Sequence, residues 1–409
     1  MSISFSYLTD DHHALQQQVK DVAGAEIEPR VQRMEAKGPH ADRELRQVMG
    51  NVGWLGVLIE PEWGGMDAGH VAKTLMLAQV SYASATAGAI LQASILGTAP
   101  IQQFGSEEMQ RMWLPLIASG EVWPTIAVTE PDTGSHVLGM RSSALRDGDE
   151  WIIDGEKDFI GNAAIADVHC VVVRTGASDS QDPRSLTAFL IEADRPGVEV
   201  IHRPVSGLRG FSVDGLRLTK VRLPQANMIG GIGDGLAVAL SSSVVYGRLN
   251  IAAVALGIHQ RIMDVTTDWV SARPRYGGHL SDLDIVRNHL AEMQSRLMSA
   301  QLAAYHAAHL LDQGQACDEW LFNAKLVNDR WAIASADEAK RLHGGHALRI
   351  DNPFERLLRD IQLLNAPAGP DDIQLKRLAE TLLGPSRTQW SKRHAASRRR
   401  PLTRGVVAV

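Results

Sequence analysis

The chain has 409 residues, of which 44% are hydrophobic and 22% are charged, as in ordinary globular proteins. This length allows two or three packed units, and a net charge of −6 excludes a general basic surface for nucleic acid. The two cysteines, Cys170 and Cys317, form no metal-binding or redox pattern and favour a reduced, cytoplasmic compartment. The polar N-terminus predicts no signal peptide. We also expect no apolar run long enough to span a bilayer, and therefore no membrane partner.

The first part of the chain, residues 1–121, has the patterns of a helical unit. Thr9 can cap a first helix in which apolar residues recur on one face. A long apolar segment, 71–103, follows a turn-rich stretch, and we expect it to break near 84–86 and again at 97–100. The many small residues in this segment indicate close helix packing at a buried position.

Residues 122–230 change to the pattern of an all-β unit. Short runs rich in β-branched residues, such as VHCVVVRT and SLTAFLIEA, are separated by Gly, Pro, Asp and Ser. Asp147-Gly148-Asp149 lies between two such runs and predicts a hairpin turn. The sequence therefore predicts a β domain of about a hundred residues.

The last part, residues 231–409, returns to helical periodicity. Long helical patterns cover 236–272, 283–313 and 317–342, and the last of them ends at Gly344-Gly345. The order of the three units is helix, sheet, helix, which predicts an α+β protein.

Two predicted loops in the β unit stand out as candidate ligand sites. The strand-like run 124–129 leads into the turn sequence EPDTGS, and 155–162 is predicted to be a second loop. Loops at the ends of neighbouring strands can frame a flat ligand with backbone groups and small hydroxyls. Many β domains have such loops, so the loops alone identify no ligand.

The sequence motifs in these segments are more specific. The pattern V-T-E-P-x-x-G-S followed by D-G-E-K-x-x-I-x-N resembles the acyl-CoA dehydrogenase family. The motifs FGSEEMQRMWLPLIASGE, RPRYGGHL, LHGGH and PFERLLRD also match this family in order and approximate spacing. The resemblance implies a helical N-domain, a β-barrel middle domain and a C-terminal four-helix bundle. It also implies a homodimer or homotetramer, with an electron-transfer flavoprotein as a candidate electron acceptor.

The resemblance implies non-covalent binding of FAD. Phe159 would cover the flavin ring by stacking, and Gly161 stands where the family has a threonine, so only its backbone N–H could serve. Arg273 would meet the diphosphate of FAD bound to the neighbouring subunit, where a guanidinium offers a planar, charged fork. The full set of expected FAD residues is Val128, Thr129, Ser135, Phe159, Gly161, Arg273, Tyr276, Arg341, Gly344 and Gly345.

The catalytic base of the family is missing at both of its known positions. Removal of the α-proton of a thioester requires a carboxylate opposite the flavin. The positions that carry this glutamate in family members are Ala368 and Gly247 in this chain. The carboxylates of Glu130, Asp371 and Asp372 are candidate substitutes, although each has a structural interpretation that we favour.

Three explanations for the missing glutamate are therefore open. Another carboxylate could replace it, or the flavin could perform different chemistry such as oxygenation. The third explanation is a flavoprotein without catalytic activity. The small residues at both positions could also enlarge the pocket for a bulkier substrate.

Several further residues are candidates for proton transfer or substrate binding. His136, His343 and His346 could donate protons near neutral pH, although single histidines are more often structural. The segment GLRGF resembles family members of natural-product pathways, in which a carrier protein can hold the acyl group. The expected substrate-binding residues are Ser135, Arg209 and Arg248, and no metal-binding pattern is present.

Overall fold

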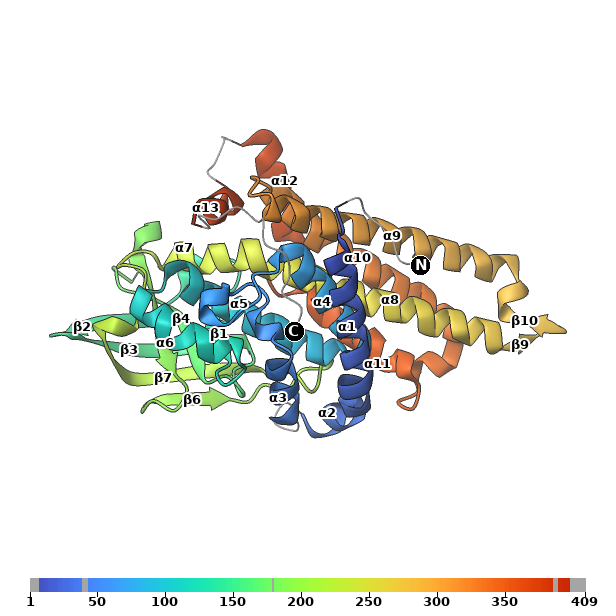
Figure 1. Ribbon diagram of the computed structural model, residues 1–409, viewed down its shortest axis with the longest axis horizontal. Coiled ribbons are helices and arrows are strands. Elements are labelled where there is room, and N and C mark those ends of the chain that lie inside the picture. Colours follow the sequence, from blue (N-terminus) through green and yellow to red (C-terminus); the bar gives the residue numbers. More distant parts are fainter. Residues whose placement is uncertain (1–6, 39–42, 179, 385–388, 398–409) are drawn as a thin grey trace.

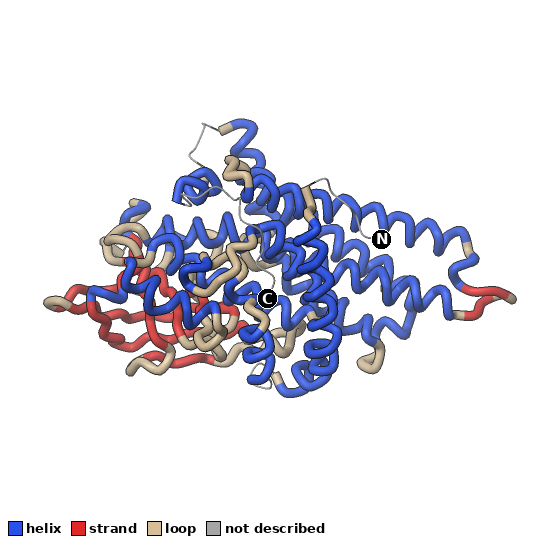
Figure 2. Tube along the Cα trace, in the orientation of Figure 1, coloured by secondary structure: helices blue, strands red, loops and turns tan. Residues whose placement is uncertain are grey.

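The computed structural model describes residues 7–38, 43–178, 180–384 and 389–397. The molecule is elongated, with the strands gathered at one end and long helices at the other (Figures 1 and 2). The order of elements is helices, then strands, then helices, and this confirms the predicted α+β class.

The N-terminal helices are shorter and more broken than their sequence pattern suggests. Thr9 caps α1 through its side chain, as predicted, but a π-helical turn at Ala23–Ile27 and a 3₁₀ turn separate α1 from α2. The α-helices among the described residues of this part are α1 Asp10–Val22, α2 Val31–Lys37, α3 Arg43–Asn51, α4 Gly69–Ala83, α5 Ala85–Phe104 and α6 Glu107–Ala118.

The long apolar segment breaks once and not twice. Ser84 has an extended backbone and its side chain accepts a hydrogen bond from the N–H of Ala87, which ends α4 and begins α5. The second predicted break, at 97–100, is wrong, because α5 continues through Pro100 to Phe104. Gly97 lets α5 approach the strand β1 (Pro124–Ala127), since a Cβ there would lie 2.5 Å from the Cα of Thr125.

The β domain is one eight-stranded sheet that follows the order β6-β7-β3-β2-β4-β5-β8, with β1 paired to β4 in parallel. All seven residues of β4 are buried. Val168, Cys170 and Val172 face a core shared with α6, while Val171 and Val173 face a second core inside the sheet. The strands are β1 Pro124–Ala127, β2 Ser143–Asp147, β3 Glu150–Gly161, β4 Val168–Arg174, β5 Leu186–Glu192, β6 Val198–Ile201, β7 Val213–Pro224 and β8 Met228–Ile229.

The hairpin predicted around Asp147-Gly148-Asp149 is confirmed by the antiparallel pairing of β2 and β3. The second predicted loop is wrong, because residues 155–161 belong to β3 and pair with β7. The pairing shifts register between Lys157 and Ile160, and this irregularity gives the strand end some of the shape expected of a loop.

The C-terminal helices pack as a bundle that ends in a small two-stranded hairpin, β9 Pro274–Arg275 and β10 Gly278–His279, at the narrow tip (Figure 1). Gly235–Ala272 is long and apolar enough to cross a membrane, contrary to our expectation, but 83% of its most apolar window is buried. This segment is therefore a core helix of the bundle. The helices are α7 Gly235–Ser241, α8 Arg248–Ala272, α9 Asp284–Asp312, α10 Asp318–His343, α11 Pro353–Gln362, α12 Asp371–Leu383 and α13 Trp390–Ser397.

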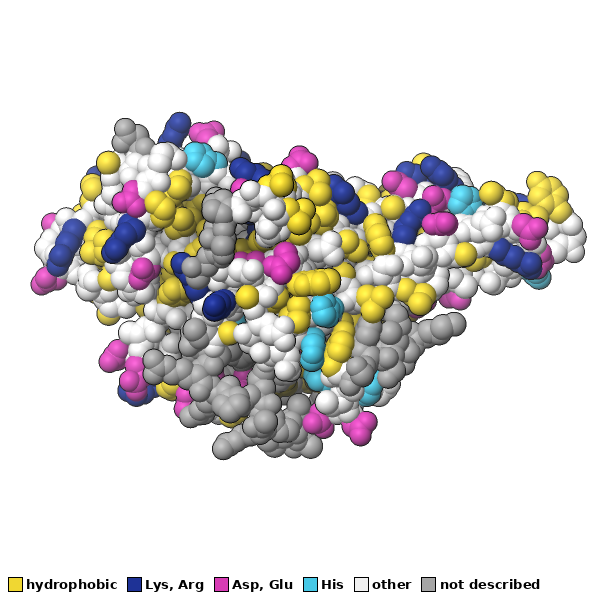
Figure 3. Space-filling model, turned by 90° about the horizontal axis from the view of Figure 1, so that it is seen from above, with side chains coloured by type: hydrophobic (Ala, Val, Ile, Leu, Met, Phe, Trp, Pro, Cys, Tyr) yellow, Lys and Arg dark blue, Asp and Glu magenta, His cyan; other side chains and the backbone are white. Residues whose placement is uncertain are grey.

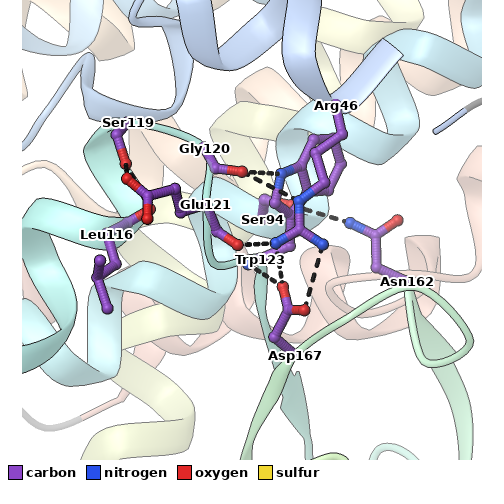
Figure 4. Close-up of polar contacts among 9 residues, drawn as sticks. All are labelled: Arg46, Ser94, Leu116, Ser119, Gly120, Glu121, Trp123, Asn162 and Asp167. Carbon is purple, nitrogen blue, oxygen red and sulfur yellow. Dashed lines mark hydrogen bonds and ion pairs between the residues drawn. The ribbon is translucent and has the colours of Figure 1, made fainter. Parts of the chain in front are cut away.

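A polar junction fixes the N-terminal helices to the β domain (Figure 4). The guanidinium of Arg46, on α3, donates to the carboxylate of Asp167 and to the carbonyl oxygens of Gly120 and Glu121. Asp167 also accepts from the backbone N–H of Trp123 at 2.7 Å, one residue before β1. This junction holds the start of β1 and therefore the position of the loop that follows it.

Candidate functional site

A cavity of 1480 Å³ lies where the N-terminal helices, the sheet and the C-terminal helices meet. This volume exceeds the usual 300–1000 Å³ or so of a small-ligand site, so it can hold a cofactor and a substrate together. The cavity brings together most of the expected residues of the β domain with both positions of the missing base. These are Val128, Thr129, Glu130, Ser135, Phe159, Gly161, Gly247, Arg248 and Ala368.

Glu130 is locked in place by hydrogen bonds. Its carboxylate accepts from the backbone N–H groups of Arg141 and Ser142 and from the buried ammonium of Lys157 at 2.8 Å. Burial acts to raise the pKa of Glu130, but the Lys157 charge and these hydrogen bonds outweigh it, and the pKa is lowered overall. A carboxylate with a lowered pKa is a weak base, so Glu130 fits a structural role.

The end of β3 presents an aromatic ring to the cavity. Phe159 has a left-handed backbone, with φ +56°, and its side chain is 65% exposed. Asn162 fixes the strand end, because its side-chain amide donates to the carbonyl of Ile90 and to the hydroxyl of Ser94, both on α5. Figure 4 shows the contact with Ser94. An exposed ring on a rigid strand end is suited to stacking on a flat ligand.

Gly161 has a steric reason to lack a side chain. A Cβ at this position would lie 2.7 Å from Cζ of Phe211, whose ring therefore occupies the space that a threonine would need. Where the family motif has threonine, this chain therefore has glycine, and the ring of Phe211 fills the space beside it.

The two positions expected to carry a base face each other on one wall of the cavity. A Cβ built on Gly247, at the junction of the π-helical turn and α8, would lie 3.3 Å from Cβ of Ala368. Ala368 has φ +55° and lies in the loop between α11 and α12. This wall is therefore formed by the two smallest side-chain types, and it carries no proton acceptor at either position.

Four carboxylates line the cavity, and each is engaged elsewhere. Besides Glu130, Asp132 is exposed near Arg141, and Glu380 pairs with Arg377 at 2.7 Å. Asp318 accepts from the N–H groups of Trp390 and Ser391 at the start of α13. Glu130, Asp318 and Glu380 would have to give up these contacts to act as a base, whereas Asp132 is exposed to solvent.

Arg248 is buried beside this wall. Its Nε donates to the side-chain oxygen of Gln374 at 2.8 Å, and its guanidinium stacks over the ring of Phe322 at 5.0 Å. Gln374 in turn donates to the carbonyls of Ala368 and Gly369, so it links Arg248 to the loop that carries one base position.

Other candidates lie outside the cavity lining. Asp371 pairs with Arg330 at 2.6 Å at the start of α12, and Asp372 beside it is exposed. Arg209 is exposed, and its Nε donates to the carbonyl of Ser206. His136 is exposed on the loop and contacts Gln181.

A second group of expected residues lies at the opposite end of the molecule from the β domain (Figure 1). Arg273 stacks on Trp269, and its Nη2 lies 3.2 Å from Nε2 of His346. Tyr276 is 92% exposed in the β9–β10 turn. Arg341 is exposed on the last turn of α10, 3.7 Å from the carboxylate of Glu338.

The glycine pair belongs to this second group. Gly344 has φ +58°, and a Cβ on either Gly344 or Gly345 would meet nothing within 4 Å, so the backbone here is open to a ligand. His343 is different, because it stacks between Trp269 and Phe354, and burial lowers its pKa to about 4. His343 is therefore a neutral core residue and no proton donor at neutral pH.

Sequence reasoning missed several residues of the cavity. Gln92, Asp318, Phe322 and Trp390 line it, and Gln374 supports it. None belongs to a motif, and each reaches the site only because distant helices pack together. No group of His, Cys, Asp and Glu in the described ranges could hold a metal ion.

Comparison with known proteins gives a consistent picture. The chain matches the acyl-CoA dehydrogenase N-terminal domain over residues 9–121, the middle domain over 125–221 and the C-terminal domain over 233–383. An acyl-CoA dehydrogenase of Bacillus subtilis (strain 168) is 31% identical over 380 residues, which cover 92% of this chain and 99% of that protein.

Solved structures are similar over nearly the whole chain. A glutaryl-coenzyme A dehydrogenase in complex with glutaryl-CoA has a TM-score of 0.88 and 28% identity, covering 93% of this chain and 97% of the other. The FAD complex of PigA has a TM-score of 0.88 and 25% identity, covering 93% and 100%.

Proposed function

The chain belongs to the acyl-CoA dehydrogenase family, and from this premise we propose that it is a flavin-dependent oxidoreductase acting on an acyl thioester. The cavity that joins the three parts of the fold would hold the flavin and the acyl group. The observation that carries the proposal is the meeting, in this one cavity, of the 128–135 loop, the exposed ring of Phe159 and the wall at Gly247 and Ala368.

The residues present fit FAD. The cavity is large enough for a flavin ring beside an acyl chain, and Phe159 offers an exposed aromatic face to it. The hydroxyl of Thr133 lines the same cavity and is buried without a hydrogen-bond partner in the described part of the chain. We propose that Val128, Thr129, Ser135, Phe159 and the backbone of Gly161 hold the flavin, which supplies a hydride acceptor when bound.

The second group of residues, around Arg273, would complete the cofactor site from another copy of the chain. Arg273, Tyr276, Arg341, Gly344 and Gly345 lie at the far end of the bundle and so cannot close the cavity of their own chain. A guanidinium and an open glycine backbone suit a diphosphate. We therefore propose a homodimer, alone or within a homotetramer.

The reaction is oxidation at adjacent carbons of the acyl chain, with coenzyme A or a carrier protein as the thiol. An electron-transfer flavoprotein is the proposed electron acceptor, and the cytoplasm is the proposed location. A second candidate function, flavin-dependent oxygenation, is favoured by the wall at Gly247 and Ala368, which offers no carboxylate to remove an α-proton.

Anaerobic mixing of the purified protein with butyryl-, octanoyl- and dicarboxylic acyl-CoA esters tests the proposal. Bleaching of the flavin absorbance with formation of an enoyl product supports the oxidoreductase. A product of increased mass that forms only with oxygen supports the oxygenase. A protein without flavin that FAD fails to reconstitute, or a flavoprotein that no thioester affects, contradicts the enzymatic assignment.

A further inference from the structure

Arg248 brings a positive charge into the protein interior. Its side chain lines the cavity and is only 4% exposed, and Nη1 has no hydrogen-bond partner in the described part of the chain. Burial, with repulsion from Arg377, lowers the pKa of Arg248 to about 10, so the group still carries its charge at neutral pH. A buried charge without a partner is costly, by several kcal/mol in real proteins.

The groups around Arg248 do not neutralise this charge. Gln374 accepts from Nε as a neutral amide, and Phe322 offers only the face of its ring. Asp318 is the nearby carboxylate whose field favours the charged form, but its oxygens accept from the N–H groups of Trp390 and Ser391 and from the Ser391 hydroxyl. Among the described residues no carboxylate forms an ion pair with Arg248.

The cavity leaves room for an anion to reach this charge. Gly247 and Ala368 keep the adjoining wall free of long side chains. An unsubstituted hydrocarbon chain in the cavity would therefore leave the charge of Arg248 unpaired.

We propose that Arg248 binds a carboxylate of the substrate, and that the acyl group of this protein is a dicarboxylic one, thioesterified at one end only. This inference rests on the proposed thioester function and names the substrate class within it. A guanidinium can grip a carboxylate through two parallel N–H···O hydrogen bonds, which are stronger than neutral ones. The substrate would thus bring the counterion that the protein does not provide.

The test compares esters that differ only in the end group. Isothermal titration of the flavin-loaded protein measures the Kd of malonyl-, succinyl- and glutaryl-CoA against propionyl-, butyryl- and valeryl-CoA, in which a methyl group replaces the carboxylate. A hydrogen bond to a charged group predicts that at least one dicarboxylic ester binds about 10- to 100-fold more tightly than its methyl partner. Equal affinities in all three pairs would overturn the inference.

Variants separate recognition from structure. Arg248→Met should reduce the preference for the dicarboxylic ester to near one, because binding of that ester weakens far more than binding of its methyl partner. Arg248→Lys keeps the charge without the planar fork and should retain part of the preference. The matched control is Arg393→Met, because Arg393 also lines the cavity but is exposed and stacks on Trp390. This control should leave the preference as it is in the unmodified protein.

Remaining outcomes are also decisive. If Arg248→Met fails to fold or to retain flavin, Arg248→Lys decides instead. The inference then requires that Arg248→Lys prefers the dicarboxylic ester less than the unmodified protein does, and an unchanged preference overturns it. Weaker binding of unacylated coenzyme A to the Arg248 variants would show that Arg248 contacts coenzyme A and not the acyl group, and would overturn the inference. Tight, flavin-bleaching binding of methyl esters without preference overturns the inference alone, whereas no binding of any ester overturns the proposed function as well.

Discussion

Ala368 occupies a strained backbone position at the point where a catalytic carboxylate would face the substrate. Its φ of +55° is unusual for a residue with a Cβ, and Gln374 holds the loop by donating to the carbonyls of Ala368 and Gly369. The loop therefore has a fixed path, and a longer side chain at 368 would project from the wall that Gly247 shares.

Ala368→Glu should accelerate flavin reduction by butyryl-CoA. A positioned general base contributes about 10²–10⁴-fold to proton removal, so we expect a gain of at least about 10²-fold in stopped-flow absorbance under anaerobic conditions. Ala368→Gln has nearly the same shape without a basic oxygen and should show no gain. Rapid reduction by the unmodified protein would show instead that another group already acts as the base.

Individual site residues were predictable to different degrees. Thr129, Phe159 and Gly247 follow from motifs, and the structure brings them to one cavity. The lack of an ion-pair partner for Arg248 was not predictable from the sequence. It depends on Asp318 accepting hydrogen bonds from the backbone at the start of α13, which is distant in the sequence. Pairing and burial are properties of tertiary packing, and a motif does not report them.

At the scale of elements, the end of β3 shows how packing decides between loop and strand. Glycine at 155 and 161 and the polar residues between them are typical of a loop, yet β7 pairs along this segment. The sheet gains its hydrogen bonds and accommodates the misfit as a register shift near Phe159. In α5, close packing against β1 similarly carries the helix through Pro100, although proline disfavours a helix interior.

Gly161→Thr should destabilise the protein, although it restores the threonine of the family motif. The new Cβ would lie 2.7 Å from Cζ of Phe211, and such overpacking costs about 1–3 kcal/mol. Thermal unfolding of the flavin-loaded protein measures the loss. In a Phe211→Leu background the penalty should shrink, since the ring that causes the clash is gone. Gly134→Thr is the control, because a Cβ there meets nothing within 4 Å; an equal loss in both variants would contradict the steric explanation.

At the scale of the whole molecule, buried histidines such as His169 and His259 link stability to pH. His169 on β4 has no hydrogen-bond partner at either ring nitrogen in the described chain, and burial lowers its pKa to about 4. Burial and the nearby Arg296 lower the pKa of His259 to about 3. Below about pH 6.5 these histidines bind protons in the unfolded chain but stay neutral in the folded protein. Their contribution to folding stability is therefore complete above that pH and is lost as the pH falls toward these lowered pKa values.

His169→Met should therefore reduce acid sensitivity. The free energy of unfolding of the unmodified protein should lose up to about 1.4 kcal/mol per pH unit from this histidine between pH 6.5 and 4, and the variant should not. Asp329 and Asp360 act in the opposite direction, because burial raises the pKa of each to about 7. The measurement is accordingly the difference between variant and unmodified protein in urea titrations across this pH range. The exposed His136→Gln serves as control, and parallel curves for His169→Met and the unmodified protein would refute the explanation.

The shape of the molecule separates the two proposed halves of the cofactor site, because the narrow tip lies far from the β domain that helps to form the cavity (Figure 1). Figure 3 shows hydrophobic side chains at that tip, where Tyr276 in the β9–β10 turn is exposed. The three-unit order was predictable from periodicity, but the distance between Phe159 and Arg273 was not, because it follows from the length of α8 and the way the bundle packs.

Complementation between two defective chains gives a direct test of a shared site. Phe159→Glu should damage the cavity side and Arg273→Glu the diphosphate side, so each parent assembly should retain little FAD. A heterodimer of the two variants, purified through different affinity tags, has one site with both defects and one with neither. It should therefore bind FAD at about half occupancy with the affinity of the unmodified protein, measured by absorbance and fluorescence titration. If both halves of the site came from the same chain, every site would carry one defect and the heterodimer would be as empty as its parents. A monomer with full FAD occupancy in light scattering would contradict the shared site independently.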